Sequence, residues 1–448
     1  TYPREYEPVA FVDDDIAKRG LEVQGIRVLG DCSEIPTLVK DNQIALVLLA
    51  IPSATVDEKH KAIEYCIASG VPSLTLPELS DIIDGAARVR DLRDVPVHEL
   101  LGRESVIIDW SSITSGIAGK RVLITGAGGS IGSELCRQVL RAQPGEMILF
   151  EQNEENLYQI HTSLQEKGLN DVNVVPRLGD VCNREAVAQV FDTFQPQVIF
   201  HAAAYKHVPL LEDQICEAAR NNMVGTYCVA SFAVEHGSES FVLISTDKAV
   251  NPESRMGASK RGAEVACAAL GKHCKTRFTT VRFGNVLGSA GSVVPLFTRQ
   301  IDEGGPVTVT DPEMERYFMT VEEASQLIIQ ASLIGQGGEI FVLDMGEPVN
   351  IDYLARQMIR LLGRIPDKEI EIVYTGLRPG EKLKEELFHP DEKLTDTGYD
   401  NILLAATRDV DSAAVRAQCD ALIAACASYD QGQVEGIITT LVPEFHPQ

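Results

Sequence analysis

Four polar residues in a row follow a short apolar segment near the middle of the chain. Residues 241–244 are apolar throughout and predict a buried strand of a parallel sheet, and they are followed directly by Ser245, Thr246, Asp247 and Lys248. Ligands of open α/β sheets bind at the carboxyl ends of the strands. An acid and a base side by side at such an edge predict proton-transfer chemistry.

A helical pattern begins near Met256, after the turn residues at 251–252, and places Lys260 one turn later on the same face. In short-chain dehydrogenases this pair is Tyr and Lys, and the Tyr exchanges a proton with the substrate. A thioether cannot do so. Either the site is inactive, or the acid and base have moved to Thr246, Asp247 and Lys248. We favour the second interpretation, because an inactive site leaves the Asp-Lys pair without a purpose.

A glycine-rich turn lies upstream of these residues. Residues 120–125 predict a strand, and the pattern T-G-x-x-G-x-x-G, with Gly126, Gly129 and Gly132, leads into a helix predicted over 131–141. Glycines let the backbone approach a pyrophosphate, which the helix N-terminus attracts. Glu151 closes the next predicted strand, nineteen residues after Gly132. Its carboxylate suits ribose hydroxyls and repels a 2′-phosphate, so the pattern predicts NAD rather than NADP.

Other predicted strands, over 172–175, 198–201 and 278–283, bring further residues to this edge. Asp180 is positioned for the adenine amine, and the small residues Ala202 and Ala203 leave room for a cofactor. His201 is expected to be a buried histidine rather than a catalytic one. The cofactor candidates are Gly126, Gly129, Ser130, Ile131, Gly132, Glu151, Asp180, Val181, Ala202, Ala203, Lys206 and Lys260.

Substrate candidates lie mainly downstream of the predicted sheet. Arg pairs bidentately with phosphate, and an amide suits a uracil, so Arg316, Arg378 and Asn285 are candidates for binding a nucleoside diphosphate. Asn222 either braces the active-site strand or satisfies backbone groups, and the sequence leaves both open. The full set is Lys206, Asn222, Asn285, Arg316, Arg378 and Glu381.

Composition excludes several classes of protein. The 448 residues carry a formal net charge of −25, which argues against a nucleic-acid-binding surface. Ten cysteines occur without zinc-type spacing, so no metal site is predicted and reduced cytosolic thiols are favoured. The longest strongly apolar segment, 44–51, is far shorter than the ~20 residues that cross a bilayer.

The order of predicted elements indicates an α/β fold: a doubly wound parallel Rossmann sheet with a smaller C-terminal substrate lobe. Residues 1–90 alternate strands and helices without a glycine-rich turn, and predict a truncated Rossmann-like domain. A structural or regulatory role is favoured over an active cofactor site. A connector is expected over 91–118 and the NAD-binding domain over 119–290. Residues 291–448 are assigned to the substrate lobe and C-terminal helices.

Five motifs in order, TGAGGSIGSEL, HAAAYKHVPLLE, ISTDKAVNP with M-x-x-x-K, RFGNVLGS and GLRPGEKLKEEL, resemble those of extended short-chain dehydrogenase/reductases that modify nucleotide sugars. The chain is most similar to membrane-anchored bacterial UDP-N-acetylglucosamine 4,6-dehydratases of the large, C5-retaining type, which serve polysaccharide and glycoprotein-sugar pathways such as that of bacillosamine. The resemblance covers residues 90–390. It implies upstream transmembrane helices, a soluble fragment at the cytoplasmic face of the inner membrane, and a homo-oligomer.

The resemblance also implies roles for individual residues. Thr246 holds the 4-hydroxyl in place of the missing Tyr, Lys248 removes the C5 proton, and Asp247 protonates the departing C6 hydroxyl. Lys260 binds the nicotinamide ribose, and Met256 marks the C5-retaining type. Lys248 must be neutral to act, so its pKa is expected to be lowered, with Lys260 contributing.

Two other functions are compatible with the sequence. A nucleotide-sugar 4-epimerase shares the fold and C4 oxidation but has no use for Asp247 and Lys248 as a pair. A non-catalytic scaffold that binds NAD or a UDP-sugar is conceivable because the Tyr is lost.

Overall fold

The computed structural model describes residues 6–51, 54–76, 93–101, 109–166, 172–289, 291–389, 392–405 and 409–446. The chain forms two compact units. One consists of Thr1–Ser105, Ala290–Met314 and Val349–Gly376, and the other of Val106–Ser289, Glu315–Pro348 and Leu377–Gln448. The predicted lobe over 291–448 is thus divided between the units. One reason is that β14 (Val307–Val309) pairs in parallel with β19 (Ile372–Tyr374), which joins two of its segments.

The larger unit is built on a nine-stranded sheet in the order β20-β21-β17-β12-β11-β10-β7-β8-β9. All neighbouring pairs from β17 to β9 are parallel, while β21 joins β17 antiparallel. The order of the parallel strands reverses between β7 and β10, as in doubly wound sheets that bind dinucleotides. The predicted fold class is confirmed.

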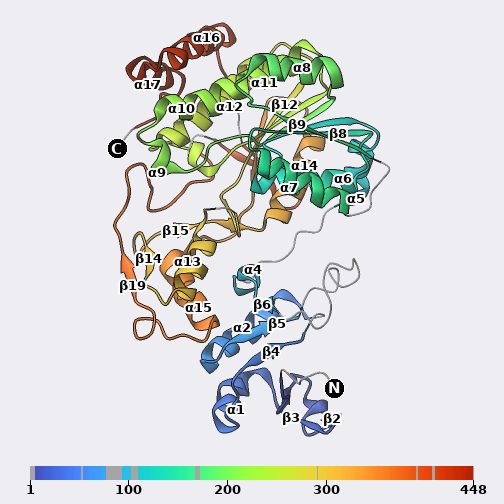
Figure 1. Cartoon of the computed structure of the whole chain (residues 1–448), viewed down its shortest axis with the longest axis vertical. Coiled ribbons are helices and arrows are strands. Elements are labelled where there is room, and N and C mark those ends of the chain that lie inside the picture. The colour runs from blue at the N-terminus through green and yellow to red at the C-terminus, as the bar shows by residue number, and fades with distance from the viewer. Residues whose placement is uncertain are drawn as a thin grey trace. The chain divides into compact units, whose positions relative to one another are not determined.

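Alternating strand residues bury opposite faces of this sheet, because successive side chains of a strand point to opposite sides. Val122 and Ile124 pack under α5, α6, α7 and α14, whereas Leu123 packs under α8, α11 and α12. Figure 1 shows these two groups of helices on either side of the sheet. Both layers are needed, since a parallel sheet is apolar on both faces.

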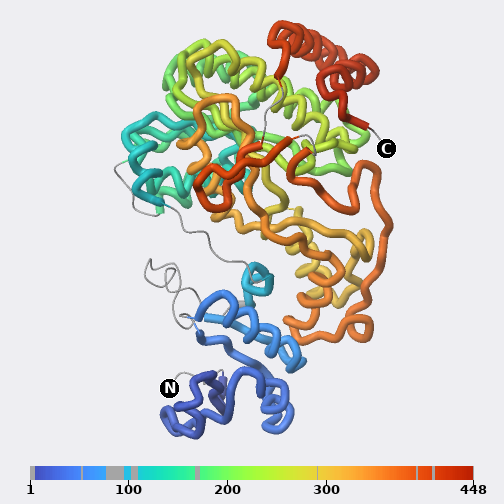
Figure 2. Tube along the Cα trace, turned by 180° about the vertical axis from the view of Figure 1, so that it is seen from behind, coloured from blue at the N-terminus to red at the C-terminus, as the bar shows by residue number. Residues whose placement is uncertain are grey.

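The C-terminal helices α16 (Ser412–Ser428) and α17 (Gln431–Leu441) cover part of the Rossmann domain. Leu422, Ile438 and their neighbours share one apolar cluster with Ile215 of α10 and Ala266 of α12. Figure 2 shows this helical pair at the end of the chain. In the structure they pack on the Rossmann helices.

The elements of the larger unit are α5 (Trp110–Ile117), β7 (Arg121–Thr125), α6 (Ser130–Arg141), β8 (Glu146–Glu151), α7 (Glu154–Glu166), β9 (Asn173–Leu178), α8 (Arg184–Phe194), β10 (Val198–His201), α9 (Val208–Leu211), α10 (Ile215–Ala219), the π-helical turn η3 (Arg220–Val224), α11 (Gly225–Glu235), β11 (Ser240–Ile244), the 3₁₀ turn η4 (Asp247–Ala249), α12 (Arg255–Gly271), β12 (Arg277–Arg282), β13 (Asn285–Val286), β15 (Glu315–Arg316), β16 (Phe318–Met319), α14 (Val321–Ile334), β17 (Glu339–Leu343), β20 (Leu394–Asp396), β21 (Ile402–Ala405), α16 and α17.

The smaller unit contains two three-stranded sheets, β1-β3-β2 and β4-β5-β6, and the pair β14-β19. Strands and helices alternate as predicted, but the strands are split between sheets instead of forming one Rossmann sheet. Its elements are β1 (Phe11–Val12), η1 (Ile16–Lys18), β2 (Glu22–Val23), β3 (Ile26–Gly30), η2 (Cys32–Glu34), α1 (Ile35–Asp41), β4 (Val47–Leu49), α2 (Val56–Ser69), β5 (Ser73–Thr75), β6 (Arg93–Asp94), α4 (Val97–Leu100), α13 (Val293–Asp302), β14, β18 (Val349–Asn350), α15 (Ile351–Leu361) and β19.

The predicted connector, 91–118, lies partly outside the described residues, which omit 91–92 and 102–108. Its described part contains β6, α4 and α5, so it is not extended throughout. No helix among the described residues combines the length and apolar character that a membrane-spanning segment needs.

Candidate active site

The central strand β11 delivers its polar residues to the carboxyl edge of the sheet, as predicted. It lies between β10 and β12, and the amides of Ser245 and Asp247 donate to the carbonyls of Val281 and Phe283, at 2.8 and 3.0 Å. Beyond the strand, Thr246 caps the turn η4 and its hydroxyl donates to Asp247 Oδ1 at 2.8 Å. This backbone is therefore held rigidly at the point where chemistry is expected.

The ammonium group of Lys248 is the centre of the site. It donates to Asp247 Oδ1 and to Asn285 Oδ1, each at 3.0 Å, and lies 3.6 Å from Glu385 Oε1. The carboxyl side chain of Asp247 is completely buried. Because Lys248, Asp247 and Asn285 meet here, three of the predicted site residues form one hydrogen-bonded group.

Glu385 is a site residue that the sequence did not reveal. It comes from the GLRPGEKLKEEL motif, in which the sequence singled out Arg378 and Glu381 instead. The structure buries Glu385 to 8% exposure beside Lys248. Glu385 Oε2 and Asp247 Oδ2 are both buried without a hydrogen-bond partner among the described residues. Buried carboxylate oxygens are normally paired, so two unpaired ones in one site indicate a place for a ligand.

The pKa of Lys248 is raised, contrary to the prediction. Burial by itself would lower this pKa, but the carboxylates of Asp247 and Glu385 outweigh burial. Arg316, not Lys260, is the cation that opposes them. Burial also raises the pKa of Glu385, and the charge of Asp247 raises it further. The two carboxylates therefore favour the charged form of Lys248.

Met256 and Lys260 lie on α12 as predicted, and both are buried. Met256 packs with Val208, Leu211 and Ala218 in a small apolar cluster, so this position has no hydrogen-bonding function. Lys260 Nζ donates to the carbonyl of Ile244 at 2.7 Å, and burial lowers the pKa of Lys260 to about 8. Lys260 therefore holds the end of β11.

The predicted substrate residues take different positions. Lys206 is exposed, and its pKa is lowered by desolvation and then by the charge of Lys248. Arg316 is buried and donates to the carbonyls of Leu383 and Lys382, at 3.0 and 2.8 Å, so it fixes the segment that carries Glu385. Arg378 is exposed, and its amide donates to Glu381 Oε2 at 3.3 Å. Of the two arginines, only Arg378 presents an exposed side chain.

Asn222 braces the site instead of facing a substrate. It is completely buried in the turn η3. Its side-chain amide accepts from the Tyr205 amide at 2.8 Å and donates to the Tyr205 carbonyl and to Ser259, each at 2.9 Å. The structure thus decides between the two roles that the sequence left open, and the assignment of Asn222 to the substrate set is corrected.

At the glycine-rich turn, the backbone of Gly126 lies close to the backbone of Ala203 and of Gly132. Gly126 has φ +65°, and a Cβ there would lie 2.7 Å from the Ala203 amide nitrogen. A Cβ on Gly132 would lie 1.9 Å from the Gly126 carbonyl oxygen. Gly129 is the N-cap of α6, whose first residues are Ser130, Ile131 and Gly132. Glycine is required for this turn and for close packing of the helix on the strand.

A cavity of about 140 Å³ lies over this turn and is lined by six of the predicted cofactor residues: Gly126, Gly129, Glu151, Val181, Ala202 and Ala203. The Glu151 carboxylate accepts from the amides of Gly128 and Asn153, at 3.0 and 2.9 Å. Asp180, which was predicted to bind the adenine amine, forms an ion pair with Arg220 at 2.8 Å.

His201 is buried between Thr125 and Thr226, and burial lowers its pKa to about 3. This confirms the prediction that His201 is a buried histidine rather than a catalytic one.

A buried network of ion pairs contacts Ser245, the residue directly after strand β11. The sequence analysis did not predict this network. Ser245 donates to Glu264 at 2.6 Å, and Glu264 binds Arg282 through both oxygens, at 2.8 and 2.7 Å. Arg282 also pairs with Glu392 at 2.7 Å, and Arg261 pairs with Glu264 at 2.9 Å. Burial alone would raise the pKa of Glu264, but the two guanidinium groups lower it to about 2.

We expect Glu264→Gln to destabilise the protein by about 1.5–3 kcal/mol, because it removes the charged acceptor of the buried hydrogen bonds from Arg282 and Arg261. Arg282 keeps its pair with Glu392, and Arg261 keeps its pair with Glu444. Since the folded-state pKa of Glu264 is lowered, its contribution is present above the unfolded pKa and is lost as pH falls toward 2. Urea unfolding at pH 7 measures the effect. The control is Glu239→Gln, which breaks the exposed 2.8 Å pair with Lys120 and should cost about 0.2–1 kcal/mol. Equal losses in the two variants would contradict this prediction.

These features define a class of protein. The sheet is doubly wound, a glycine-rich turn precedes the N-terminus of α6, and the acid–base pair Asp247-Lys248 follows strand β11. Together these features define a Rossmann-fold enzyme of short-chain dehydrogenase/reductase type. The chain belongs to the family described as "Polysaccharide biosynthesis protein", whose model matches residues 122–407.

Named relatives agree with this assignment. The capsular polysaccharide biosynthesis protein CapD of Staphylococcus aureus is 46% identical over 398 residues, which are 88% of this chain and 66% of CapD. The probable polysaccharide biosynthesis protein EpsC of Bacillus subtilis is 45% identical over 90% of this chain and 67% of EpsC. This chain therefore spans about two thirds of the length of these relatives.

Solved structures share the fold. The X-ray structure of Pen from Bacillus thuringiensis matches with a TM-score of 0.60 and 32% identity, over 66% of this chain and 89% of Pen. The dTDP-glucose 4,6-dehydratase DesIV of Streptomyces venezuelae, solved with NAD bound, matches with a TM-score of 0.53 and 20% identity, over 71% of this chain and 99% of DesIV.

Proposed function

We propose that this protein is an NAD-dependent 4,6-dehydratase that converts UDP-N-acetylglucosamine to a UDP-2-acetamido-2,6-dideoxy-4-keto-hexose. The observation that carries the proposal is the 3.0 Å hydrogen bond between Lys248 Nζ and Asp247 Oδ1, next to two unpaired carboxylate oxygens. An elimination across C5 and C6 needs a base and an acid that reach neighbouring carbons of one sugar ring. A UDP-glucose 4-epimerase relative and the dehydratase DesIV, which both act on nucleotide sugars by their names, support a nucleotide sugar as substrate.

The cofactor cradle fits NAD. Gly126, Gly129 and Gly132 leave no room for side chains where the backbone turns, and the N-terminus of α6 favours a pyrophosphate. Glu151 would hold the adenosine ribose and Lys260 the nicotinamide ribose. When bound, NAD⁺ supplies an acceptor for the C4 hydride, which returns to the sugar at C6. Lys260 Nζ donates one hydrogen bond to the Ile244 carbonyl, at 2.7 Å. An ammonium group has three donors, so Lys260 could contact the ribose and keep this hydrogen bond.

The O4 proton has a route to Asp247 through Thr246. The Thr246 hydroxyl donates to Asp247 Oδ1 at 2.8 Å, so Thr246 can accept the O4 proton as it passes its own proton to the carboxylate. Asp247 then carries the proton that the C6 hydroxyl needs to leave as water. In this scheme the O4 proton ends in the water that is released.

Glu385 provides a place for the proton that Lys248 must lose. Protonation of Asp247 removes a negative charge that raises the pKa of Lys248, and Glu385 lies 3.6 Å away with a raised pKa of its own. With its proton moved to Glu385, Lys248 is neutral and takes the C5 proton. The protons on the Lys248 ammonium exchange with solvent, so Lys248 delivers a solvent-derived proton to C5 as the hydride reaches C6. The proton on Glu385 then returns to Lys248. Proton positions are thereby restored, and no net oxidation occurs.

The proposal is tested by incubating the protein with NAD and UDP-N-acetylglucosamine in D₂O. The expected product has lost one water and carries deuterium at C5, because the C5 proton exchanges through Lys248. Mass spectrometry and proton NMR at C5 and C6 report both changes. Substrate recovered unchanged, with NAD bound to the protein, would refute the dehydratase.

A nucleotide-sugar 4-epimerase is the second candidate. The observation in its favour is the UDP-glucose 4-epimerase of Rickettsia rickettsii, which is 32% identical over 61% of this chain and 79% of that enzyme. An epimerase would interconvert C4 configurations without loss of water and without deuterium at C5. A non-catalytic scaffold would show neither change, although a bound UDP-sugar at 100 times its Kd would add ~2.7 kcal/mol of stability.

We expect Glu385→Gln to shift the pH dependence of dehydration. The Glu385 carboxylate raises the pKa of Lys248, so its replacement by a neutral amide should lower that pKa. The part of the pH–rate profile that reports the loss of the Lys248 proton should move to lower pH. The maximal rate should also fall, because the glutamine amide cannot take up the proton that Lys248 releases. The control is Glu386→Gln, at the exposed neighbouring position. An unchanged profile would show that Glu385 does not act on Lys248.

A further inference from the structure

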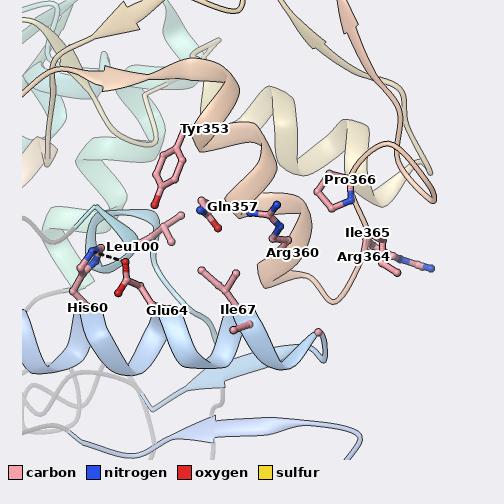
Figure 3. A pocket seen from close by; sticks show the side chains of 12 residues that line it. His60, Glu64, Ile67, Leu100, Tyr353, Gln357, Arg360, Arg364, Ile365 and Pro366 are labelled. Carbon is pink, nitrogen blue, oxygen red and sulfur yellow. Dashed lines mark ion pairs between the residues drawn. The ribbon is translucent and has the colours of Figure 1, made fainter. Parts of the chain in front are cut away.

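A hollow in the smaller unit lies between α2 and α15 and shares no residue with the site above. Its volume is about 420 Å³, within the range of small-molecule sites. Figure 3 shows His60, Glu64 and Ile67 rising from α2, with Leu100 beside them, and Tyr353, Gln357 and Arg360 descending from α15. All of these residues belong to one compact unit.

Two buried polar atoms of this hollow have no hydrogen-bond partner among the described residues. They are His60 Nδ1 and Gln357 Oε1. His60 Nε2 lies 3.7 Å from Glu64 Oε1, which favours placing the ring proton on Nε2 and leaves Nδ1 as an acceptor. Both unpaired atoms therefore call for hydrogen-bond donors, which a ligand in the hollow would supply.

Arg360 contributes a cation without a carboxylate partner in the described part of the chain. The contrast is Arg356, one turn earlier on α15, which pairs with Asp352 at 2.8 Å and with Asp367. Arg360 is exposed at the rim of the hollow, and Glu64, the acid that lines the same hollow, lies beside His60 instead. The position of Arg360 in the last turn of α15 suits the helix dipole, but this does not account for its place among the lining residues.

The remaining walls are largely apolar. Ile67, Leu100 and Pro366 line the hollow, together with the ring of Tyr353. A bare inorganic anion would leave these walls and both unpaired acceptors unused. The suitable ligand has an anionic group for Arg360, hydrogen-bond donors for Gln357 and His60, and a flat body to lie against Tyr353. This combination is the chemistry of a nucleoside phosphate.

We propose that the hollow between α2 and α15 is a second ligand site, which binds a nucleoside mono- or diphosphate through Arg360 and Gln357. It does not depend on the proposed dehydratase activity, because it shares no residue with that site. Its place in the smaller unit suits a regulatory ligand whose binding is separate from turnover.

The test counts bound nucleotide on the full chain by equilibrium dialysis, with UMP, CMP, AMP, GMP and their diphosphates as probes and inorganic phosphate alongside. For at least one nucleotide, Arg360→Gln should weaken one binding event by about tenfold or more, because a charge-assisted contact to phosphate is lost. Arg364→Gln is the matched control. Arg364 lies four residues later, beyond the end of α15, and Figure 3 shows its guanidinium directed away from the other lining residues.

A second variant, Ile67→Trp, fills the hollow from α2 without removing a charge, and should abolish the same event. Circular dichroism and the melting temperature verify that each variant is folded. If no nucleotide shows binding that depends on Arg360, or if Arg364→Gln weakens it equally, the proposal is wrong. If inorganic phosphate binds as tightly as every nucleotide, the nucleoside part is wrong. Dehydratase activity is measured in a separate assay, so the nucleotide-binding result can be interpreted even if the protein is not a dehydratase.

Discussion

Replacing Asp247 by Asn is expected to slow the loss of water from UDP-N-acetylglucosamine by about 10²–10⁴-fold, the usual range for removal of a general acid. The amide keeps the shape of the carboxyl group but cannot deliver a proton to the departing C6 hydroxyl. It also cannot take up the proton that Thr246 donates across 2.8 Å. Formation of the 4-keto-6-deoxy product, followed by mass spectrometry, measures the effect.

The Asp247→Asn variant also separates the two enzymatic candidates. An epimerase should keep most of its activity, because C4 inversion needs no acid at C6. Asp213→Asn is the control, since Asp213 is exposed and lies outside the site. Near-normal water loss by Asp247→Asn would remove Asp247 from the proposed mechanism.

Replacing Lys248 by Met should have an effect of similar size, about 10²–10⁴-fold on dehydration, with a distinct isotopic signature. Methionine has a similar length but no group that can accept the C5 proton. Deuterium from D₂O should no longer enter at C5, even in residual product or in recovered substrate. Nuclear magnetic resonance of the sugar after long incubation measures this.

Lys384→Met is the matched control for Lys248→Met, because Lys384 is exposed and pairs with Glu315 at 3.0 Å outside the acid–base group. Its exchange at C5 should be unchanged. If Lys248→Met retained full C5 exchange, another residue would have to be the base.

Local sequence patterns predicted most of the larger unit. The run before Ser245 became β11, and the glycine triplet became the turn between β7 and α6, within a residue or two of the expected bounds. These elements are readable because each depends on neighbouring residues: apolar runs specify buried strands, and glycines specify tight turns. The position of Asp247 and Lys248 followed from the rule that ligand-binding residues lie at the carboxyl ends of parallel strands. The hydrogen bond from Lys248 to Asn285 was not predicted.

Contacts between residues far apart in the sequence could not be predicted from local sequence patterns. Glu385 lies 137 positions after Lys248 in the numbering, and the two meet only in the folded chain. Arg316 helps to hold Glu385 there by donating to the backbone carbonyls of Lys382 and Leu383. Glu264, Arg282 and Glu392 likewise come from three separate parts of the chain. Nothing in the local pattern around each residue marks it as a partner of the others.

The sequence by itself determined the fold class, the position of the cofactor turn and the acid–base pair at the end of β11. The tertiary structure alone decided which groups surround Lys248, that two carboxylates raise its pKa, and that Asn222 and Arg316 brace the site. The physical reason is that strands and turns arise from short-range preferences. A side chain's charge state and partners depend instead on burial and on groups brought close by the complete fold.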